Sequence, residues 1–270
     1  MDLAAARRAV LQLLGAVAPA DRAALLHWMR TTEDFDKFTE DNNDIILKNI
    51  ADDLRNCLPL ETMLSSEHLA LQKLQQQPEP TVHVDAFLYD EDCIDSLCEE
   101  GKMSRHYCTV CGSHQTASLG FISHSFSLME LKFIYHHVLP DLSGKVLVDV
   151  GSRLGTVLYG GYLYSSAVQL YGVELNGDFC QLQEMVIKKY HFSDRIKVLH
   201  ADICTQGSLL QNADVVIMNN VFEYFLHETE QTTNIQLSTW VEEIPLNYDV
   251  YPQKDFDREA LEQIHVYKIL

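Results

Sequence analysis

The chain has little positive charge and no long apolar run. Its 270 residues carry 20 Lys and Arg against 39 Asp and Glu, a formal charge of −19. Binding to a phosphate backbone depends on clustered Lys and Arg, so direct nucleic-acid binding is not expected and a basic partner is the more natural one. No stretch reaches the roughly 18 apolar residues of a membrane span, so no membrane association is expected.

The chain has only seven cysteines, an odd number. A chain this long buries enough apolar surface to need no disulfides, so reduced thiols or metal ligands are expected. Cys180 and Cys204 are expected in apolar surroundings. Residues 7–20 have the basic start, apolar stretch and Ala-x-Ala end of a signal peptide, but the helical spacing continues through residues 21–29. An amphipathic helix explains this pattern better, and the expected localisation is cytoplasmic or nuclear.

Composition divides the chain into three regions. Apolar residues recur at helical spacing through residues 1–75, which predicts a helical N-terminal region. The sequence QQQPEP breaks this pattern and is the expected linker. Residues 76–115 are an acidic connector that bears Cys and His residues, with seven acids and no base between positions 85 and 100. Residues 116–270 show alternating strand and helix signals, which predict an α/β domain with a parallel sheet covered on both faces.

Four buried-strand patterns lie at residues 145–151, 170–176, 196–203 and 213–220. Helical patterns alternate with them, among them residues 158–169 and 177–191. Ligands of an open parallel sheet bind beyond the carboxyl ends of its strands, where glycines let the backbone approach the ligand. Asp149, Gly151, Ser152 and Gly155 lie at that place after the first strand. Arg153 stands where the middle glycine of a dinucleotide motif would be, which disfavours NAD.

Polar side chains also end the other three strands. Glu174 ends the second, where an acid can accept hydrogen bonds from both ribose hydroxyls. Asp202 and Ile203 end the third, where an acid can accept from an exocyclic amine, and Asn219 and Asn220 end the fourth. A purine nucleoside would gain contacts from each strand end in turn. The alternative is a domain without a cofactor, in which the acids only cap helices.

The sequences VDVGSRLG, GVELN, HADI and VIMNNVFEYF resemble the first four motifs of the class I S-adenosylmethionine-dependent methyltransferases. VDVGS with YGVE and NN..F is most similar to the seven-strand, non-SET histone lysine methyltransferases. The resemblance covers residues 126–225 and implies a Rossmann-like sheet with S-adenosylmethionine as cofactor. It implies that the cofactor is bound by Asp149, Gly151, Ser152, Gly155, Glu174, Asp202, Ile203, Asn219 and Phe222.

The implied reaction is direct methyl transfer, in which the protein aligns nucleophile, methyl and sulfur and excludes water. The catalytic candidates are Asn219 and Asn220, which could orient an amine, and Glu223, which could take a proton or simply begin the next helix. A basic protein is the expected methyl acceptor, because acidic surfaces are expected at residues 85–100 and in the C-terminal tail, where ten acids and three bases lie from Glu223 onward. Solubility alone would explain the same charge. The alternative function is a methyltransferase-like binding or regulatory protein without turnover.

A Cys and His segment precedes the α/β pattern. Cys108-x-x-Cys111-Gly has the form of a zinc knuckle, and a structural zinc needs four ligands. Cys93 and Cys98 are the candidates for the other two, although their segment also fits one face of a helix. Thiols in a loop without metal are the alternative. The possible substitutes as ligands are His106, His114 and His124.

The two flanks of the α/β pattern carry further expectations. Ser127 and Glu130 form a capping box, which explains these residues locally. The resemblance implies that residues 124–126 before it could close over the cofactor. Residues 221–270 are fewer than the roughly 80 that a full class I sheet needs after its fourth strand. We expect the loss of a strand and a helix near residues 231–238, as in an alternatively spliced form, or a naturally minimal sheet. Such a loss predicts a poorly covered fourth strand.

Overall fold

The computed structural model describes residues 3–58, 81–102, 106–108, 116–118, 120–122, 125–219, 241–251 and 258–270. The chain forms two compact units, Met1–Asn43 and Asp44–Leu270. The expected linker at residues 75–80 and the sequence before it from residue 59 lie outside the described residues. The boundary near residue 75 therefore stays a prediction.

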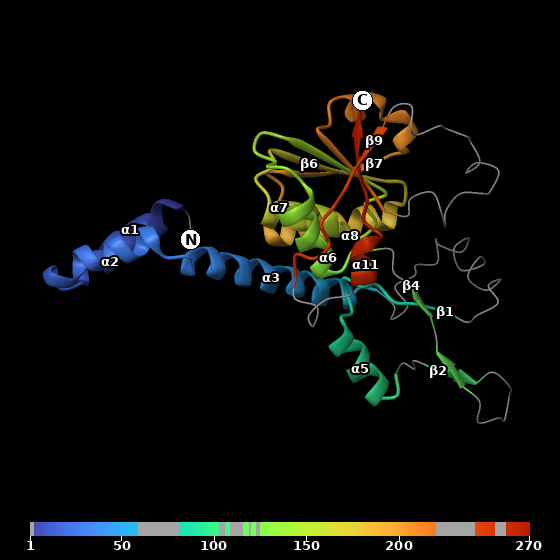
Figure 1. Ribbon diagram of the computed structural model, residues 1–270, viewed down its shortest axis with the longest axis horizontal. Helices are drawn as coiled ribbons and strands as arrows, with labels where there is room; N and C mark the ends of the chain where they lie inside the picture. Colours follow the sequence, from blue (N-terminus) through green and yellow to red (C-terminus); the bar gives the residue numbers. More distant parts are fainter. Residues whose placement is uncertain are drawn as a thin grey trace. The chain divides into compact units, whose positions relative to one another are not determined.

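The first unit is helical (Figure 1). It contains α1 (Leu3–Ala16), α2 (Pro19–Thr31) and the start of α3 (Asp34–Arg55). Pro19 lies in the first turn of α2, where its missing N–H would have no helical partner in any case. None of the described helices of the chain has the length and apolar character needed to cross a membrane.

The second unit is built on four parallel strands, whose order across the sheet is β7-β6-β5-β8. The strands are β5 (Val146–Val150), β6 (Gln169–Glu174), β7 (Ile196–His200) and β8 (Val215–Met218). Strand β5 lies in the interior of the sheet, with β6 and then β7 on one side of it and β8 on the other. This is the strand order of a Rossmann-like sheet, which confirms the predicted fold class. Its switch point, where ligands bind, lies between β5 and β8.

Helices cover one face of this sheet (Figure 1). They are α6 (Leu128–Phe133), continued by the π-helical turn η2 (Ile134–Val138), α7 (Thr156–Tyr164) and α8 (Gly177–Tyr190). The predicted capping box is confirmed, because Ser127 Oγ accepts from the Glu130 N–H and Glu130 Oε2 accepts from the Ser127 N–H. The shorter η3 (Ile203–Thr205) and α9 (Gly207–Gln211) connect β7 with β8.

Alternate residues of the strands pack on opposite faces. Val148, Val150 and Val173 form one buried cluster, while Leu147 and Leu170 belong to the larger cluster that the helices cover. This is the period-two alternation of a strand, here apolar on both faces as a parallel sheet requires.

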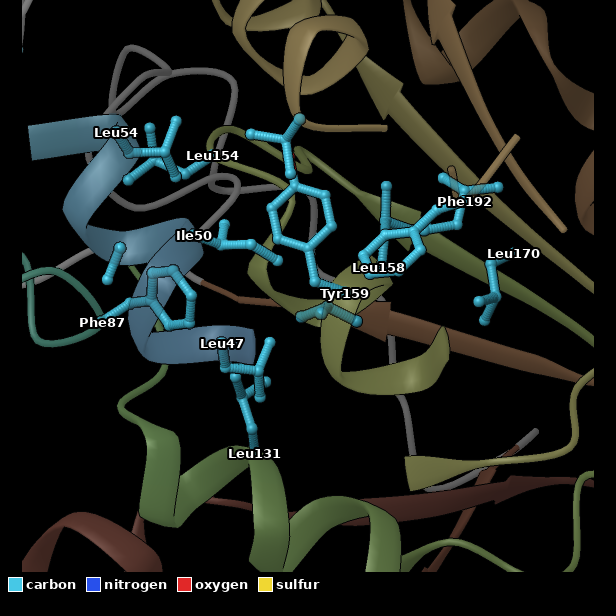
Figure 2. Close-up of a cluster of buried hydrophobic side chains, with 14 of the residues drawn as sticks. Leu47, Ile50, Leu54, Phe87, Leu131, Leu154, Leu158, Tyr159, Leu170 and Phe192 are labelled. Atoms are coloured by element: carbon cyan, nitrogen blue, oxygen red, sulfur yellow. The ribbon is translucent and has the colours of Figure 1, made fainter. Parts of the chain in front are cut away.

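The C-terminal part of α3 packs into the core of the second unit (Figure 2). Leu47, Ile50 and Leu54 are 0% exposed and recur at helical spacing on one face. They share a buried cluster with Phe87 and Leu131. This part of the expected N-terminal region therefore belongs to the core of the α/β unit.

Short elements complete the second unit. The connector contains α5 (Glu91–Glu99), β1 (Thr81–His83) and β2 (His106–Cys108). Just after it, β3 (Thr116–Ser118) pairs with β2 and β4 (Gly120–Ile122) pairs with β1. At the C-terminus, β9 (Val241–Ile244) and β10 (Val266–Ile269) pair with each other, and α11 (Arg258–Glu262) lies between them in sequence.

Within the described part of the chain, β5 is the single strand partner of β8. Met218 on β8 is 61% exposed. Residues 231–238 lie outside the described residues, so the loss of a strand and a helix there stays a prediction.

Candidate functional site

The loop of residues 151–155, here called the glycine loop, turns sharply after β5. Gly151, Arg153 and Gly155 all have positive φ angles, of 71°, 40° and 82°. A glycine takes this conformation without steric cost. The Gly151 N–H donates to the carbonyl oxygen of Val173 at 2.8 Å, which fixes the loop to the end of β6. The loop lies at the switch point of the sheet, where the sequence predicts a ligand.

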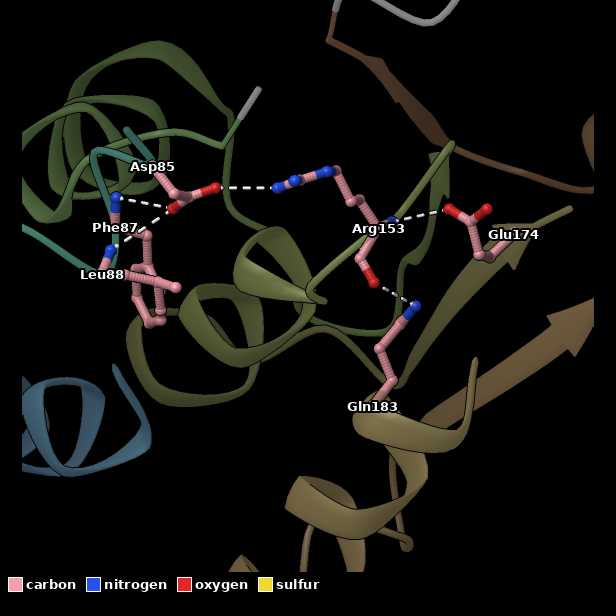
Figure 3. A network of polar contacts seen from close by, with 6 residues as sticks. All are labelled: Asp85, Phe87, Leu88, Arg153, Glu174 and Gln183. Carbon is pink, nitrogen blue, oxygen red and sulfur yellow. Dashed lines mark hydrogen bonds and ion pairs between the residues drawn. The ribbon is translucent and has the colours of Figure 1, made fainter. Parts of the chain in front are cut away.

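Glu174 ends β6 and its carboxylate faces the glycine loop (Figure 3). Oε2 accepts from the Arg153 N–H at 2.8 Å, and Oε1 accepts from the Asn176 N–H at 2.7 Å. A carboxylate has about four lone-pair directions, so these bonds leave room for a further donor. Burial raises the pKa of Glu174, while the main-chain N–H groups and the Arg153 charge oppose that rise.

The helix that follows β6 has a different cap. Asn176 is the N-cap of α8, and its side chain accepts from the Asp178 N–H at 2.8 Å. Glu174 is therefore not the cap of this helix. The alternative in which the acid after β6 merely caps a helix does not apply to it.

Asp149 is a second buried acid, 3% exposed, near the end of β5. Burial raises its pKa well above the ordinary range, and the charge of Glu174 adds to that rise. Two neighbouring acids in a poorly solvated place favour a bound cation or a retained proton. This electrostatic character fits a ligand that carries positive charge.

Ser152 and Arg153 form hydrogen bonds with a side chain of α8. The Ser152 hydroxyl donates to Oε1 of Gln183 at 3.0 Å, and Gln183 Nε2 donates to the carbonyl oxygen of Arg153 at 2.8 Å. Gln183 is 0% exposed. Sequence reasoning missed this residue, although its place on the buried face of an amphipathic helix, beside Val186 and Ile187, is a signal that could have found it.

Arg153 points away from the loop and forms a buried ion pair with the connector (Figure 3). Its Nη1 lies 2.9 Å from Oδ2 of Asp85, and the two side chains are 7% and 0% exposed. The expectation that Asp85 belongs to an acidic surface is therefore wrong. A charge this deeply buried is found paired, and Arg153 is the partner. Asp92, Asp95 and Glu99 of the same stretch are exposed.

Asp202 and Asn219 lie at the ends of β7 and β8. Asp202 is exposed and caps η3, because its carboxylate accepts from the Cys204 N–H at 2.8 Å. Ile203 and Asn219 are half-buried. Asn219 directly follows Met218, which pairs in register with Val150, so the backbone of Asn219 lies beside that of Gly151. The predicted site residues Asn220, Phe222 and Glu223 lie outside the described residues.

The cysteines that the structure describes fit the alternative of thiols without a metal. Cys93 and Cys98 lie on α5 and pack against the core, and burial raises the pKa of Cys93, which disfavours the thiolate that zinc requires. Cys180 is buried as expected, but Cys204 is exposed, so that expectation is wrong. Its place in η3, beside the exposed Asp202, is the reason.

The structure gives the zinc site no support. The described residues contain no group of three or more His, Cys, Asp or Glu side chains that could hold a metal. Cys111, His114 and His124 lie outside those residues, and Cys108 is the last residue of β2. The Cys108 and Cys111 knuckle stays a prediction.

No protein-family model and no curated protein matches the sequence. Solved structures do match. A candidate RNA methyltransferase, PH1948 from Pyrococcus horikoshii, is 26% identical over 28% of this chain and 36% of its own, with a TM-score of 0.25. PRMT6 is 24% identical over 29% of this chain and 22% of its own, with a TM-score of 0.25. TrmK from M. capricolum, in complex with S-adenosylhomocysteine, is 13% identical over 34% of this chain and 38% of its own, with a TM-score of 0.27.

The matched solved structures include many class I S-adenosylmethionine-dependent methyltransferases. The chain spans less than two fifths of the length of each of the three named above. The fold assignment rests on the strand order and the register of β5 to β8. The particular similarity to histone lysine methyltransferases stays a prediction.

Proposed function

We propose that this chain is an S-adenosylmethionine-dependent methyltransferase that binds its cofactor at the carboxyl ends of β5 and β6. One observation carries the proposal. The buried carboxylate of Glu174 accepts a hydrogen bond from the glycine loop, at the switch point of a Rossmann-like sheet. An acid at this place is suited to the two hydroxyls of a ribose.

The residues present fit this cofactor and not a dinucleotide. The pyrophosphate of a dinucleotide needs backbone approach and a favourable positive field. Here Arg153 stands at the position of the middle glycine, and its charge is already paired with Asp85. S-adenosylmethionine has no phosphate and carries a sulfonium and an ammonium group. The buried acids Asp149 and Glu174 suit such a cation.

Each residue has a definite task in this proposal. Glu174 accepts from the ribose hydroxyls, Asp149 supplies negative charge beneath the methionine part, and Gly151 lets the backbone approach the ligand. Asp202, at the exposed rim, accepts from the adenine amine. When bound, the cofactor supplies the methyl group on a sulfonium leaving group. The protein contributes alignment and exclusion of water.

The methyl acceptor would lie next to β8. The backbone of Asn219 lies beside Gly151, and its side-chain carbonyl is suited to orient an amine. Asn220 and Glu223 follow in sequence and are the further catalytic candidates, with Phe222 beside the reacting methyl. The exposed acids of α5 favour a basic protein as acceptor through charge complementarity. The proposed localisation is cytoplasmic or nuclear.

Calorimetric titration with S-adenosylhomocysteine tests the cofactor site. We expect the wild-type chain to bind it and Glu174→Gln to bind at least about tenfold more weakly. Asp214→Asn is the matched control, because Asp214 also accepts from a main-chain N–H, that of Val146 at 2.9 Å, but lies at the opposite end of the sheet. Its affinity should equal that of the wild type. A wild-type chain that does not bind would contradict the proposal.

A second candidate function is a binding or regulatory protein that holds the cofactor without turnover. The exposure of Met218 on β8 favours it, because a poorly covered fourth strand would leave the acceptor side open. A methyl-transfer assay with a basic protein, RNA and small amines separates the two functions. Methylation of the basic protein would support the enzyme, and preferential methylation of RNA would overturn the proposed acceptor class.

A further inference from the structure

The backbone of Arg153 is strained. Its φ of 40° lies in the left-handed region, which is unfavourable for a residue with a Cβ. Such a conformation persists only where the surroundings hold it, and it is often found at functional sites. The contacts that hold Arg153 are therefore of interest, because its N–H is one of the main-chain donors to the Glu174 side chain.

Two of these contacts come from the α/β core. Gln183 donates to the Arg153 carbonyl oxygen at 2.8 Å, and the guanidinium lies over the ring of Phe179, 4.9 Å from its centroid. Both residues belong to α8. They limit the movement of Arg153, but neither of them neutralises its charge.

The third contact comes from the connector, 68 residues earlier in the sequence. Asp85 lies between β1 and α5 and is 0% exposed. Its Oδ1 accepts from the N–H groups of Phe87 and Leu88 at 3.0 and 3.3 Å, and its Oδ2 lies 2.9 Å from Arg153 Nη1. The local turn thus fixes the carboxylate, so Asp85 presents a rigid charge to the guanidinium (Figure 3).

A buried ion pair is by itself weak evidence for stability, since the cost of removing both charges from water offsets their attraction. Its position here is more informative. The pair joins the connector to Arg153, the residue of the glycine loop that has a positive φ without being a glycine. The N–H of Arg153 in turn donates to Glu174.

We propose that Asp85 is a positioning residue of the cofactor site. By holding the Arg153 guanidinium, it keeps the Arg153 N–H on the Glu174 carboxylate and so fixes the direction of that carboxylate. The consequence for cofactor binding rests on the proposed function. The consequence for the loop does not.

Asp85→Asn tests the proposal, because it keeps the size of the side chain and removes its charge. We expect the affinity for S-adenosylhomocysteine to fall by about tenfold or more. Hydrogen exchange of the ligand-free protein should show the Arg153 N–H exchanging about tenfold faster. A merely structural role would not single out that amide.

Asp44→Asn is the matched control. Asp44 pairs with Lys132 at 2.8 Å in the same unit, also partly buried, but away from the glycine loop. This variant should leave both the affinity and the Arg153 exchange unchanged. The double variant Asp85→Asn with Arg153→Gln removes both charges, and so avoids leaving one charge buried alone. It should regain stability relative to Asp85→Asn and still bind S-adenosylhomocysteine weakly.

The outcomes separate the two proposals. If the wild type does not bind S-adenosylhomocysteine, the proposed function fails, while faster exchange confined to the glycine loop in Asp85→Asn still supports the positioning role. If the wild type binds and Asp85→Asn equals it in affinity and in exchange, the positioning role is overturned. A uniform rise of exchange across the whole second unit would also overturn it, because the pair would then only stabilise the fold.

Discussion

Gly155 of the glycine loop leaves no room for a side chain. Its φ is 82°, and a Cβ built there would lie 2.7 Å from both Cζ and the hydroxyl oxygen of Tyr159 and 3.0 Å from Cγ of Gln183. Tyr159 is 0% exposed, so it cannot move into solvent to make room. Gly155→Ala therefore combines an unfavourable backbone conformation with a steric overlap in the core.

The magnitude follows from these two contributions. A left-handed conformation costs a residue with a Cβ about 1–2 kcal/mol, and inserting a methyl into a packed core costs about 1–3 kcal/mol more. Gly144→Ala is the matched control, because Gly144 has a similar φ of 72° but nothing within 4 Å of the added Cβ. The two variants should thus differ by about 1–3 kcal/mol, or about 3–10 °C in melting temperature for a unit of this size.

Thermal unfolding of both variants, with calorimetric titration of S-adenosylhomocysteine, is the assay. Gly155→Ala should also weaken cofactor binding, because displacing Gln183 disturbs its hydrogen bond to Arg153. Gly144→Ala should bind as the wild type does. Equal melting temperatures for the two variants would refute the reasoning, since the close approach to Tyr159 would then have no energetic consequence.

Three other predictions concern single side chains of the same region. Tyr159→Phe should raise stability by about 1 kcal/mol in urea unfolding, because the buried Tyr159 hydroxyl has no hydrogen-bond partner among the described residues; a loss of stability would contradict this. Asp149→Asn should stabilise the fold by an amount that is small near pH 4 and grows as the pH rises to 8, since the raised pKa of Asp149 means that the folded state loses stability as pH rises. Melting curves at the two pH values measure it, and a gain that does not change with pH would show that the acid is not the cause. Glu174→Gln should weaken binding of S-adenosylhomocysteine more than Asp202→Asn, because Glu174 is buried and is proposed to accept from two hydroxyls while Asp202 is exposed; equal losses by titration would remove the ribose role.

The parallel strands and their order of polar ends were predictable from local sequence. Apolar runs rich in Val, Ile and Leu indicate strands buried on both faces, and helical patterns between them require a parallel sheet. The carboxyl ends of such strands meet at one edge. For this reason the sequence alone placed Gly151, Glu174 and Asn219 together, and the register of β5 with β6 and β8 agrees.

Element boundaries were less predictable. The helical pattern was expected to run from Leu158 to Gln169, but α7 ends at Tyr164 and Gln169 already begins β6. A long-range contact explains the earlier end. The guanidinium of Arg195 donates to the carbonyl oxygens of Ser165 and Ala167, both at 3.1 Å, and holds this segment out of the helix. Local periodicity carries no information about that partner.

The Asp85 and Arg153 pair was not predictable for a similar reason. An arginine in a buried glycine loop needs a counter-charge. With 39 acids in the chain, however, the sequence does not say which one supplies it. Seven acids close together at residues 85–100 suggested a solvated surface, and the one that is buried differs from the others only by its tertiary contacts.

The α/β unit needs residues that lie before its expected start in order to fold. Leu47, Ile50 and Leu54 of α3 fill its core, and Asp85 holds its glycine loop, yet all four lie before residue 116, where the sequence placed the start of the domain. A chain beginning at residue 116 would expose that core and leave the Arg153 charge buried without its partner, a loss of about 3–5 kcal/mol for the broken pair alone. A chain beginning at Asp44 keeps both. We therefore expect the fragment 44–270 to unfold cooperatively and to bind S-adenosylhomocysteine, and the fragment 116–270 to do neither in circular dichroism and titration. Cooperative unfolding of the shorter fragment would show that α3 and the connector are dispensable, and would contradict the structural role assigned to them.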